Sequence, residues 1–372
     1  MHHGFGRGTL WFLLCCAVTA QTGGIVEKIL CPATRQTPRI SEGDVEILKD
    51  GSLLLAYTEF FGGDGSDWGA ARIAGRTSRD RGRTWSEPFT IIANTGKMNV
   101  MDANLLRLRS GRLALVHALK NSMADCRLLF RTSSDEGKTW TDPVTITTPV
   151  KYWGINNDRL VQLKSGRLLA PVFVVEDWAK SHHTRNAVFY SDDEGRTWKQ
   201  SELVDVPQGK RGADEPGVIE LRDGRILQIV RTDLGKIFVS HSSDGGVHWT
   251  APQPTELTAP TAPASIARIP STGDLLIVWN NSPVGPKHTH DRFPLTAAIS
   301  KDEGRTWKNI RNLDATPGFA YAYTSITFLP NKEVLFTYYA ADTRPKAKED
   351  HSDHSMISLK MKIVPVDWFY RP

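Results

Sequence analysis

The side chains best suited to chemistry recur at one position of an internal repeat. Counting nine residues back from the turn glycine of each repeat gives Glu42, Asp102, Asn157, Glu215, Ala264 and Tyr323, with Pro263 as an alternative to Ala264 because the fifth turn is longer. Carboxylates beside a tyrosine can move protons and activate a nucleophile. If the repeats surround one axis, these side chains meet in one cavity, and we predict a site there. The alternative is that they cap strand ends or bind water in a central channel.

The turns that set this spacing are followed by apolar strands. Each turn with its strand is typical of a β-hairpin, and a further apolar strand such as Ala103–Leu108 or Val218–Leu221 precedes it. The copies are Lys49–Leu55, Arg109–Leu115, Lys164–Leu169, Arg222–Leu227, Ser271–Ile277 and Pro330–Phe336, the last with Lys332 in place of glycine. Six hairpins predict six small sheets.

A second repeat follows the pattern S-x-D-x-G-x-T-W. Its five copies are Ser78–Trp85, Ser133–Trp140, Ser191–Trp198, Ser242–Trp249 and Ser300–Trp307, with His248 in place of threonine in the fourth. Their serines lie 55, 58, 51 and 58 residues apart, which is a repeat period. The pattern predicts a tight turn in which Asp and Ser side chains cap backbone N–H groups, glycine takes a positive φ, and tryptophan covers the turn. The motif specifies a fold and has no functional content.

These motifs are Asp boxes, and a chain with five of them resembles the sialidase (BNR-repeat) superfamily over nearly its whole mature length. The resemblance implies an all-β fold, a six-bladed β-propeller. The sixth blade has no Asp box, and we expect its strands at Ser325–Leu329, Glu333–Tyr339 and Met356–Val364. Its fourth strand is expected at Gly24–Leu30, because an N-terminal strand that closes the last blade removes the exposed sheet edges.

The resemblance also implies roles for site residues. Sialidases are similar to one another in an arginine triad that binds a carboxylate, a tyrosine nucleophile with a glutamate partner, and an aspartate acid/base. The segment Glu215–Leu221, followed by Arg231, is similar to the one with the partner glutamate and the second arginine. Tyr323–Thr327 is similar to the nucleophile segment, although Thr324 stands between the tyrosine and the serine.

The other two arginines of the triad are implied by shorter segments. Arg39-Ile40-Ser41 is similar to the first-arginine motif, with Ser41 where proline is usual. Arg292, eight residues before the serine of the last Asp box, occupies the place of the third arginine. For any one of these arginines, the alternative is a surface charge or a salt bridge between blades.

The acid/base is expected in the glycine-rich loop Phe60–Ala70, which holds Asp64 and Asp67. A glycine-rich loop with one acid suits a proton transfer that closes over substrate. We favour Asp67 over Asp64, although either could simply form a turn, as Asp-Gly at 64–65 suggests. Of the remaining ring residues, Asp102 and Asn157 are expected to bind substrate.

This set of residues suits a sialic acid, which has a carboxylate on its anomeric carbon. Three guanidinium groups can clamp that carboxylate with charge-assisted hydrogen bonds, each worth about 1.5–3 kcal/mol. A carboxylate nucleophile would be repelled by the substrate, whereas a neutral tyrosine avoids this repulsion. Because the pKa of a free tyrosine is about 10, Tyr323 needs a base, and Glu215 fits that role. We therefore predict retaining, exo-acting hydrolysis of sialylated or related acidic glycans, with no cofactor.

Two other functions remain open at this point. A related hydrolase would act on another 2-keto acid sugar such as Kdn or Kdo, or on a uronate-containing glycan. A non-catalytic propeller that binds glycan or protein would carry the same Asp boxes, but it would not need Tyr323 and Glu215 together.

The composition is that of a soluble globular protein. The 372 residues are 40% hydrophobic and 23% charged, with a formal net charge of +5 and no long basic run that would indicate a nucleic-acid partner. No compact metal-ligand set accompanies the histidines at 182, 183, 288 and 290. We predict a single domain over residues 21–372.

The first 20 residues are predicted to be a signal peptide. His2, His3 and Arg7 precede the apolar run Leu10–Val18, and Val18-Thr19-Ala20 is typical of a cleavage site. This indicates a secreted or periplasmic protein without stable membrane insertion, because the run is too short to span a bilayer. A lipoprotein attached through Cys15 or Cys16 is the alternative. Cleavage leaves two cysteines at 31 and 126, which we expect to be buried and unpaired.

Overall fold

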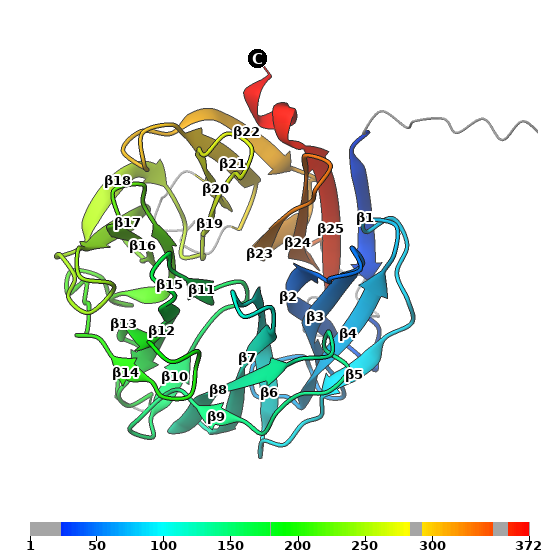
Figure 1. The fold of residues 1–372 in the computed structure, drawn as a ribbon, viewed down its shortest axis with the longest axis horizontal. Helices are drawn as coiled ribbons and strands as arrows, with labels where there is room; N and C mark the ends of the chain where they lie inside the picture. The colour runs from blue at the N-terminus through cyan, green and yellow to red at the C-terminus, as the bar shows by residue number, and fades with distance from the viewer. Residues whose placement is uncertain (1–23, 179, 283–291, 345–355, 372) are drawn as a thin grey trace, which may run out of the picture.

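The structure is a computed structural model that describes residues 24–178, 180–282, 292–344 and 356–371. It is all-β, as predicted, and its strands are arranged around a common axis (Figure 1). The predicted signal peptide lies outside the described residues, and so do His288 and His290. Among the described residues, no helix is long and apolar enough to cross a membrane.

Most strands pair antiparallel with the next strand in the chain. The first run is β2 (Arg39–Ile47), β3 (Leu53–Phe60), β4 (Ala71–Ser78) and β5 (Phe89–Ile92), and the second is β6 (Asn99–Arg107), β7 (Leu113–Ser122), β8 (Asp125–Ser133) and β9 (Val144–Thr145). After the short β10 (Tyr152–Gly154) come β11 (Val161–Gln162), β12 (Leu168–Val175), β13 (Thr184–Ser191) and β14 (Lys199–Gln200). The strands β3, β7 and β12 begin directly after the predicted turns, because each of these turns is followed by a largely buried apolar segment.

The second half of the chain repeats this pattern. One sheet consists of β15 (Asp214–Glu220), β16 (Ile226–Arg231), β17 (Lys236–Ser242) and β18 (Gln253–Thr258), and another of β19 (Ser265–Arg268), β20 (Leu275–Asn280), β21 (Leu295–Ser300) and β22 (Lys308–Asp314). The last run is β23 (Phe319–Phe328), β24 (Glu333–Asp342) and β25 (Ile357–Pro365), followed by a 3-10 helix, η1 (Val366–Tyr370). The N-terminal strand β1 (Val26–Cys31) pairs with β25, as predicted.

Backbone pairing divides these strands into four sheets of eight, nine, four and four strands. A parallel pair between Arg39 and Ile357 joins β2 to β25, and another between Tyr152 and Cys126 joins β10 to β8. No closed sheet forms among the described strands, and four sheets are fewer than the predicted six. The fold is propeller-like because its strands surround one axis (Figure 1), and the six-blade count stays a prediction.

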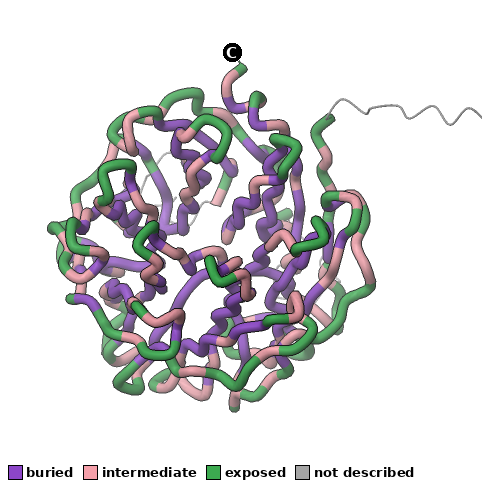
Figure 2. The backbone as a smooth tube through the Cα atoms, in the orientation of Figure 1, coloured by how far each residue is buried: buried purple, intermediate pink, exposed green. Residues whose placement is uncertain are grey.

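The buried residues lie between neighbouring groups of strands and along the strands nearest the axis. Figure 2 shows the strands mostly buried and the connecting turns on the periphery exposed. Cys31 and Cys126 are buried and unpaired, which confirms the prediction for these two thiols. Their burial in apolar surroundings follows from the position of each in a strand that packs against the core.

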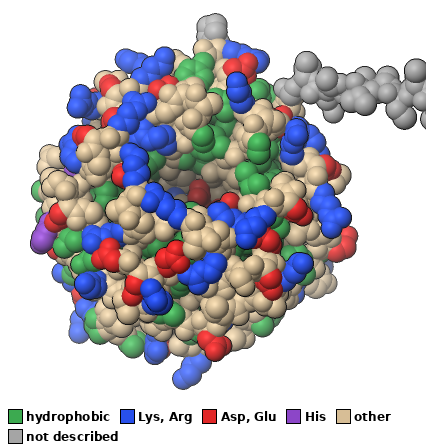
Figure 3. Space-filling view, in the orientation of Figure 1, with side chains coloured by type: hydrophobic (Ala, Val, Ile, Leu, Met, Phe, Trp, Pro, Cys, Tyr) green, Lys and Arg blue, Asp and Glu red, His purple; other side chains and the backbone are tan. Residues whose placement is uncertain are grey.

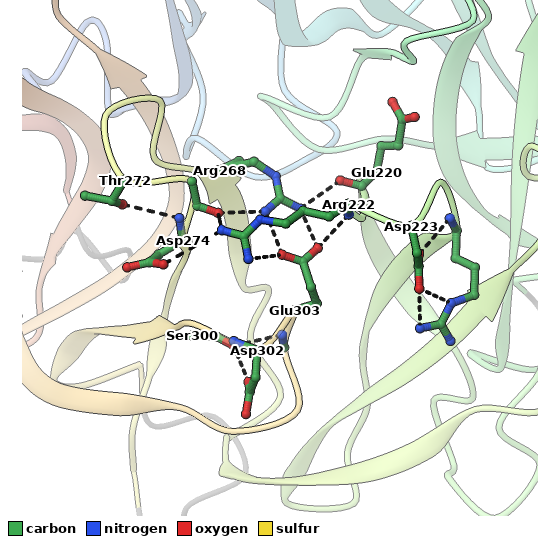
Figure 4. Close-up of polar contacts among 12 residues, drawn as sticks. Glu220, Arg222, Asp223, Arg268, Thr272, Asp274, Ser300, Asp302 and Glu303 are labelled. Atoms are coloured by element: carbon green, nitrogen blue, oxygen red, sulfur yellow. Dashed lines mark hydrogen bonds and ion pairs between the residues drawn. The ribbon is translucent and has the colours of Figure 1, made fainter.

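The Asp boxes close their turns as the motif predicts. In the last copy, the Ser300 hydroxyl donates to Asp302 at 2.8 Å and accepts from the Gly304 N–H at 2.8 Å, while Gly304 has a φ of +85°. The box also links two runs (Figure 4), because Glu303 accepts two hydrogen bonds of 2.8 Å from the Arg268 guanidinium and one of 2.8 Å from the Arg222 backbone N–H. Glu136 of the second box contacts Arg107 and the Lys49 backbone in the same way.

Candidate active site

Bulges in the inner strands present four of the predicted ring residues. Positive φ angles occur at Glu42 (48°), Asp102 (62°), Glu215 (37°) and Tyr323 (57°), and the strand register shifts at each of them. Such angles are costly for residues other than glycine, by about 1–3 kcal/mol each, and they persist where the surrounding structure enforces them. A bulge also re-aims a side chain. The repeated bulge explains how one spacing in the sequence places similar side chains at equivalent positions.

The third repeat departs from this spacing by one residue. There the positive φ (55°) belongs to Asp158, and Asn157 is fully buried one residue earlier. The Asn157 amide donates to the backbone carbonyls of Gly43 at 2.7 Å and Tyr323 at 3.0 Å. Asn157 therefore links β2 and β23 by hydrogen bonds, and this placement does not support the predicted contact with substrate. In the fifth repeat, Ala264 contributes a carbonyl that accepts from Arg159 at 2.8 Å.

Arg39 is buried and fully engaged by acidic and hydroxyl groups. Its guanidinium donates to Ser41 Oγ at 2.8 Å, Glu42 Oε1 at 2.5 Å and Asp67 Oδ1 at 2.5 Å. The Ser41 hydroxyl, at the position where the resemblance has proline, also donates to Glu42 at 2.7 Å. Glu42 and Ser41 therefore fix the orientation of Arg39 from the same strand. The sequence placed Glu42 in the ring, but only the structure shows it contacting Arg39.

Asp67, and not Asp64, points toward Arg39. The ion pair with Arg39 holds the pKa of Asp67 down, at about 2, with Lys120 assisting against the effect of burial. The Asp64 carboxylate accepts the backbone N–H of Ser66 at 2.8 Å, which is a turn-forming contact. The Asp67 side chain remains 56% exposed, so it is accessible from solvent while paired.

Glu215 lies between Arg231 and Tyr323. Arg231 forms a short ion pair with one Glu215 oxygen, and the Tyr323 hydroxyl donates to the other at 3.2 Å. Burial alone would raise the pKa of Glu215, but the guanidinium groups of Arg231 and Arg292 outweigh it and lower the pKa below its usual value. Burial and the Glu215 charge both raise the pKa of Tyr323. In the resting site, the Glu215 carboxylate therefore accepts a hydrogen bond from the neutral Tyr323 hydroxyl.

Arg292 completes the group beside Tyr323. Its guanidinium carbon lies 5.4 Å from the centre of the Tyr323 ring, and it donates to the Tyr339 hydroxyl at 2.5 Å. Tyr339 was not singled out from the sequence, although it ends an apolar segment of the predicted strand Glu333–Tyr339. The predicted arginines Arg39, Arg231 and Arg292 thus contact Asp67, Glu215 and Tyr323, respectively.

Asp102 differs from the other acids because its carboxylate has no hydrogen-bond donor among the described residues. The residue is only 7% exposed, and its backbone N–H donates to Thr58 at 3.0 Å. Burial, together with the nearby charge of Glu42, raises the pKa of Asp102 well above its usual value. Figure 3 shows the molecule hollowed at its centre, with acidic side chains at the bottom of the hollow. A carboxyl group whose pKa is raised in this way can donate a hydrogen bond to a bound hydroxyl group or accept one from it.

The described residues contain no cluster of three or more His, Cys, Asp or Glu side chains that could hold a metal ion. The side chains of the site supply three cations for an anion, a tyrosine hydrogen-bonded to a carboxylate, and a second, separate aspartate.

Comparison with known proteins places the chain in a family. The BNR repeat-like domain matches residues 51–334. A sialidase of Micromonospora viridifaciens is 28% identical over 327 residues, which cover 77% of this chain and 47% of the relative. A sialidase of Bacteroides fragilis is 26% identical over 225 residues, covering 57% and 39% of the two chains. The chain thus spans less than half the length of these relatives.

A solved structure shows the same fold. The NanB sialidase of Streptococcus pneumoniae superposes with a TM-score of 0.70 at 16% identity, over 92% of this chain and 71% of that one. At this identity the likeness speaks for the fold alone. Because the family match extends over most of the chain and the repeats, fold and relatives agree with it, the protein belongs to the BNR repeat-like domain family of the sialidase superfamily.

Proposed function

We propose that this protein is an exo-acting glycoside hydrolase that releases terminal sialic acid from glycoconjugates with retention, through Tyr323 as the nucleophile. The observation that supports this most directly is the contact of Tyr323 with Glu215, flanked by Arg231 and Arg292. The proposal includes a six-bladed propeller as one domain over residues 21–372, exported after removal of residues 1–20 to the periplasm or the exterior. Its partners are sialylated or related acidic glycans.

Substrate binding begins with an exchange of carboxylates. In the resting site, Asp67 is bound to Arg39. The substrate carboxylate takes that place and is held by Arg39, Arg231 and Arg292 through charge-assisted hydrogen bonds. Asp67 then loses the contact that keeps its pKa low, so its pKa rises and it can hold a proton. The acid is thereby prepared only when an anionic substrate is present.

The first chemical step joins the sugar to the enzyme. The Tyr323 oxygen attacks the anomeric carbon while Glu215 accepts the phenol proton, and the bond from that carbon to the leaving oxygen breaks. Asp67 donates its proton to the leaving oxygen. In the second step Asp67 takes a proton from water, the water oxygen attacks the anomeric carbon, and Tyr323 leaves and recovers its proton from Glu215. Two displacements at one carbon give retention.

The first experiment is hydrolysis of an aryl α-ketoside of N-acetylneuraminic acid by the wild type and by Tyr323→Phe. We expect turnover by the wild type, the α-anomer as the first product in a proton NMR time course, and near-complete loss in the variant. Tyr190→Phe is the control, because the Tyr190 ring lies 4.5 Å from the guanidinium carbon of Arg167 and packs against the apolar cluster around Leu169 and Val188, none of which belongs to the site. Undiminished turnover by Tyr323→Phe would overturn the proposed nucleophile.

A further inference from the structure

A buried lysine lies near the end of a strand, close to the site. Lys120, in β7, is 1% exposed and follows the buried segment of that strand. Burying an ammonium group costs several kcal/mol unless it is paired and hydrogen-bonded, so its contacts need a reason. None of the roles described above uses Lys120.

The contacts of Lys120 converge on the loop that holds Asp67. Its Nζ donates to the backbone carbonyl of Asp67 at 2.9 Å and lies 4.8 Å from the centre of the Trp68 ring and 5.4 Å from that of Tyr152. Both rings attract the ammonium group electrostatically. Lys120 thus holds both the backbone of the aspartate and the side chain of the residue after it.

A second side chain on the neighbouring strand acts on the same loop. The Asn99 amide donates to the carbonyls of Asp67 at 2.9 Å and Gly69 at 2.8 Å. The Asp67 carbonyl therefore accepts two hydrogen bonds from buried donors of β6 and β7, strands outside the loop. Together with the contact of the Gly62 N–H with the Gln36 carbonyl at 2.9 Å and the Arg39–Asp67 ion pair, these two donors hold the loop against the site.

The charge of Lys120 adds to the geometric contact. It favours the ionised forms of both Asp67 and Asp102 and lowers their pKa values, although it is not the largest influence on either. In the resting site, the ammonium group therefore adds to the effect of Arg39 in keeping Asp67 ionised.

We propose that Lys120 is a positioning residue that places Asp67 for proton donation to the leaving oxygen. This inference rests on the proposed function, and it goes beyond that function because it assigns a role in catalysis to a side chain that does not touch the reacting atoms. Its distinguishing consequence is a dependence on the leaving group: a sugar alkoxide needs protonation to depart, whereas a good aryl leaving group does not.

The test compares two substrates in the variant Lys120→Met, which keeps the length of the side chain and removes the ammonium group. General acid catalysis contributes about 100-fold or more, so we expect kcat/KM for a sialyl trisaccharide to fall by about 100-fold and kcat/KM for an aryl α-ketoside by less than about 5-fold. The ratio kcat/KM is compared because it reports only the steps up to departure of the leaving group, before Asp67 acts as the base toward water. Tyr323→Phe should instead lose both activities.

A double-mutant cycle shows whether Lys120 acts through Asp67. If it does, Lys120→Met should have no further effect on trisaccharide hydrolysis in an Asp67→Ala background, because the group being positioned is gone. Lys362→Met is the matched control, since Lys362 also donates from a mostly buried ammonium to a backbone carbonyl, that of Leu313 at 2.6 Å, but lies in β25, where it pairs with Glu27 of β1. It should lower the thermal midpoint without any dependence on the leaving group.

The possible outcomes separate this inference from the proposed function. Equal losses on both substrates, or a rise in KM alone, would overturn the positioning role while the hydrolase proposal stands. A wild type without turnover of either substrate would overturn the hydrolase proposal. Loop placement is then still measurable: amide hydrogen exchange over residues 61–70 should be faster in Lys120→Met than in the wild type, and unchanged protection would overturn the positioning role in that case too.

Discussion

At the scale of single residues, the site is a set of carboxylates held by arginines. Glu215 shows what this does to acid strength, because its two guanidinium neighbours lower its pKa despite burial. A carboxylate whose pKa is lowered stays ionised to lower pH, so in the proposed mechanism the proton acceptor for Tyr323 remains available well into the acidic range. The same mechanism requires the opposite change in the pKa of Asp67, which follows when Asp67 leaves Arg39.

Replacement of the base tests this assignment. We expect Glu215→Gln to lower kcat by about 100-fold or more, since general base catalysis is lost while the amide keeps the size of the side chain. The acidic limb of kcat/KM should also disappear, because it reports the ionisation of Glu215 in the free enzyme. Both are measured from initial rates on the aryl α-ketoside between acidic and neutral pH. A retained acidic limb would assign the ionisation to another group.

The ion pair of Asp67 makes stability depend on pH. A carboxyl group whose pKa is lower in the folded than in the unfolded chain stabilises the fold above its unfolded pKa of about 3.9, and this stabilisation is lost as the pH falls through the folded pKa. For Asp67 that pKa is about 2. Above about pH 5, Asp67→Asn should therefore unfold more easily than the wild type, by less than about 1 kcal/mol because the side chain is partly solvated.

Urea unfolding at several pH values measures this difference directly. The gap between wild type and Asp67→Asn should close as the pH is lowered from about 4 toward 2. A gap that widens on acidification would show that Asp67 is not paired with Arg39 in the resting protein.

At the scale of the elements, the turns both shape and join the runs of strands. The Asp-box glycine Gly195 and the hairpin glycine Gly224 have nearly equal φ angles of +86° and +87°. A Cβ atom added to Gly224 meets nothing within 4 Å, whereas one added to Gly195 lies 2.2 Å from the ring of Phe130 in the preceding run. The box glycine is therefore required for its conformation and for its contact with a neighbouring run.

A pair of alanine variants separates these two requirements. Gly224→Ala should cost about 1–2 kcal/mol, the price of a left-handed conformation. Gly195→Ala should cost about 1–3 kcal/mol more, because Phe130 must move. Chemical denaturation of the two variants gives the comparison. Equal losses would mean that the box glycine has no packing role.

The sequence predicted the elements well because their signals are local. Turn glycines, Asp-box side chains and apolar strands all act within about ten residues, and the hairpins follow from them. The pairing of β1 with β25 was expected from the family resemblance, in which the N-terminal strand covers an exposed sheet edge. The nine-residue count succeeded at Glu42, Asp102, Glu215 and Tyr323, where a long inner strand carries the bulge. It missed Asp158 because the inner strand of the third repeat is reduced to two residues.

Contacts between repeats could not be predicted from local signals. Tyr323 and Glu215 are 108 residues apart, and only the arrangement around the axis brings them into contact. The ion pair of Arg39 with Asp67 and the hydrogen bond from Asn157 to Gly43 likewise depend on how the chain is arranged around the axis. Lys120 did leave a local signal, a cation directly after the mostly apolar segment Leu113–Leu119, but the sequence does not show what it contacts.

At the scale of the whole molecule, the two ends of the chain are joined by charge as well as by strand pairing. Lys360 of β25 forms ion pairs with Glu27 of β1 and with Asp314 of β22, the latter at 2.6 Å. Asp314 also accepts from the Tyr338 hydroxyl at 2.9 Å. One buried lysine thus connects the N-terminal strand, the last run and the run before it.

Removal of each acid partner should have unequal effects. Asp314 has a side chain that is 2% exposed, so Asp314→Asn should cost about 3 kcal/mol by leaving Lys360 without its buried partner. Glu27 is 35% exposed, and Glu27→Gln should cost less than about 1 kcal/mol. Urea unfolding at neutral pH tests both. A larger loss for Glu27→Gln would place the important contact at the N-terminal strand instead.

Tyr323, the proposed nucleophile, lies in the same sheet as the N-terminal strand. It belongs to β23, and β23 is in one sheet with β24, β25 and β1. During synthesis on the ribosome, Arg39, Asp67 and Glu215 therefore emerge long before the strands that hold Tyr323 in place. In the proposed mechanism, a nascent or prematurely terminated chain has most of the anion-binding groups but no attacking oxygen, so hydrolysis requires the first and last strands of the chain to have paired.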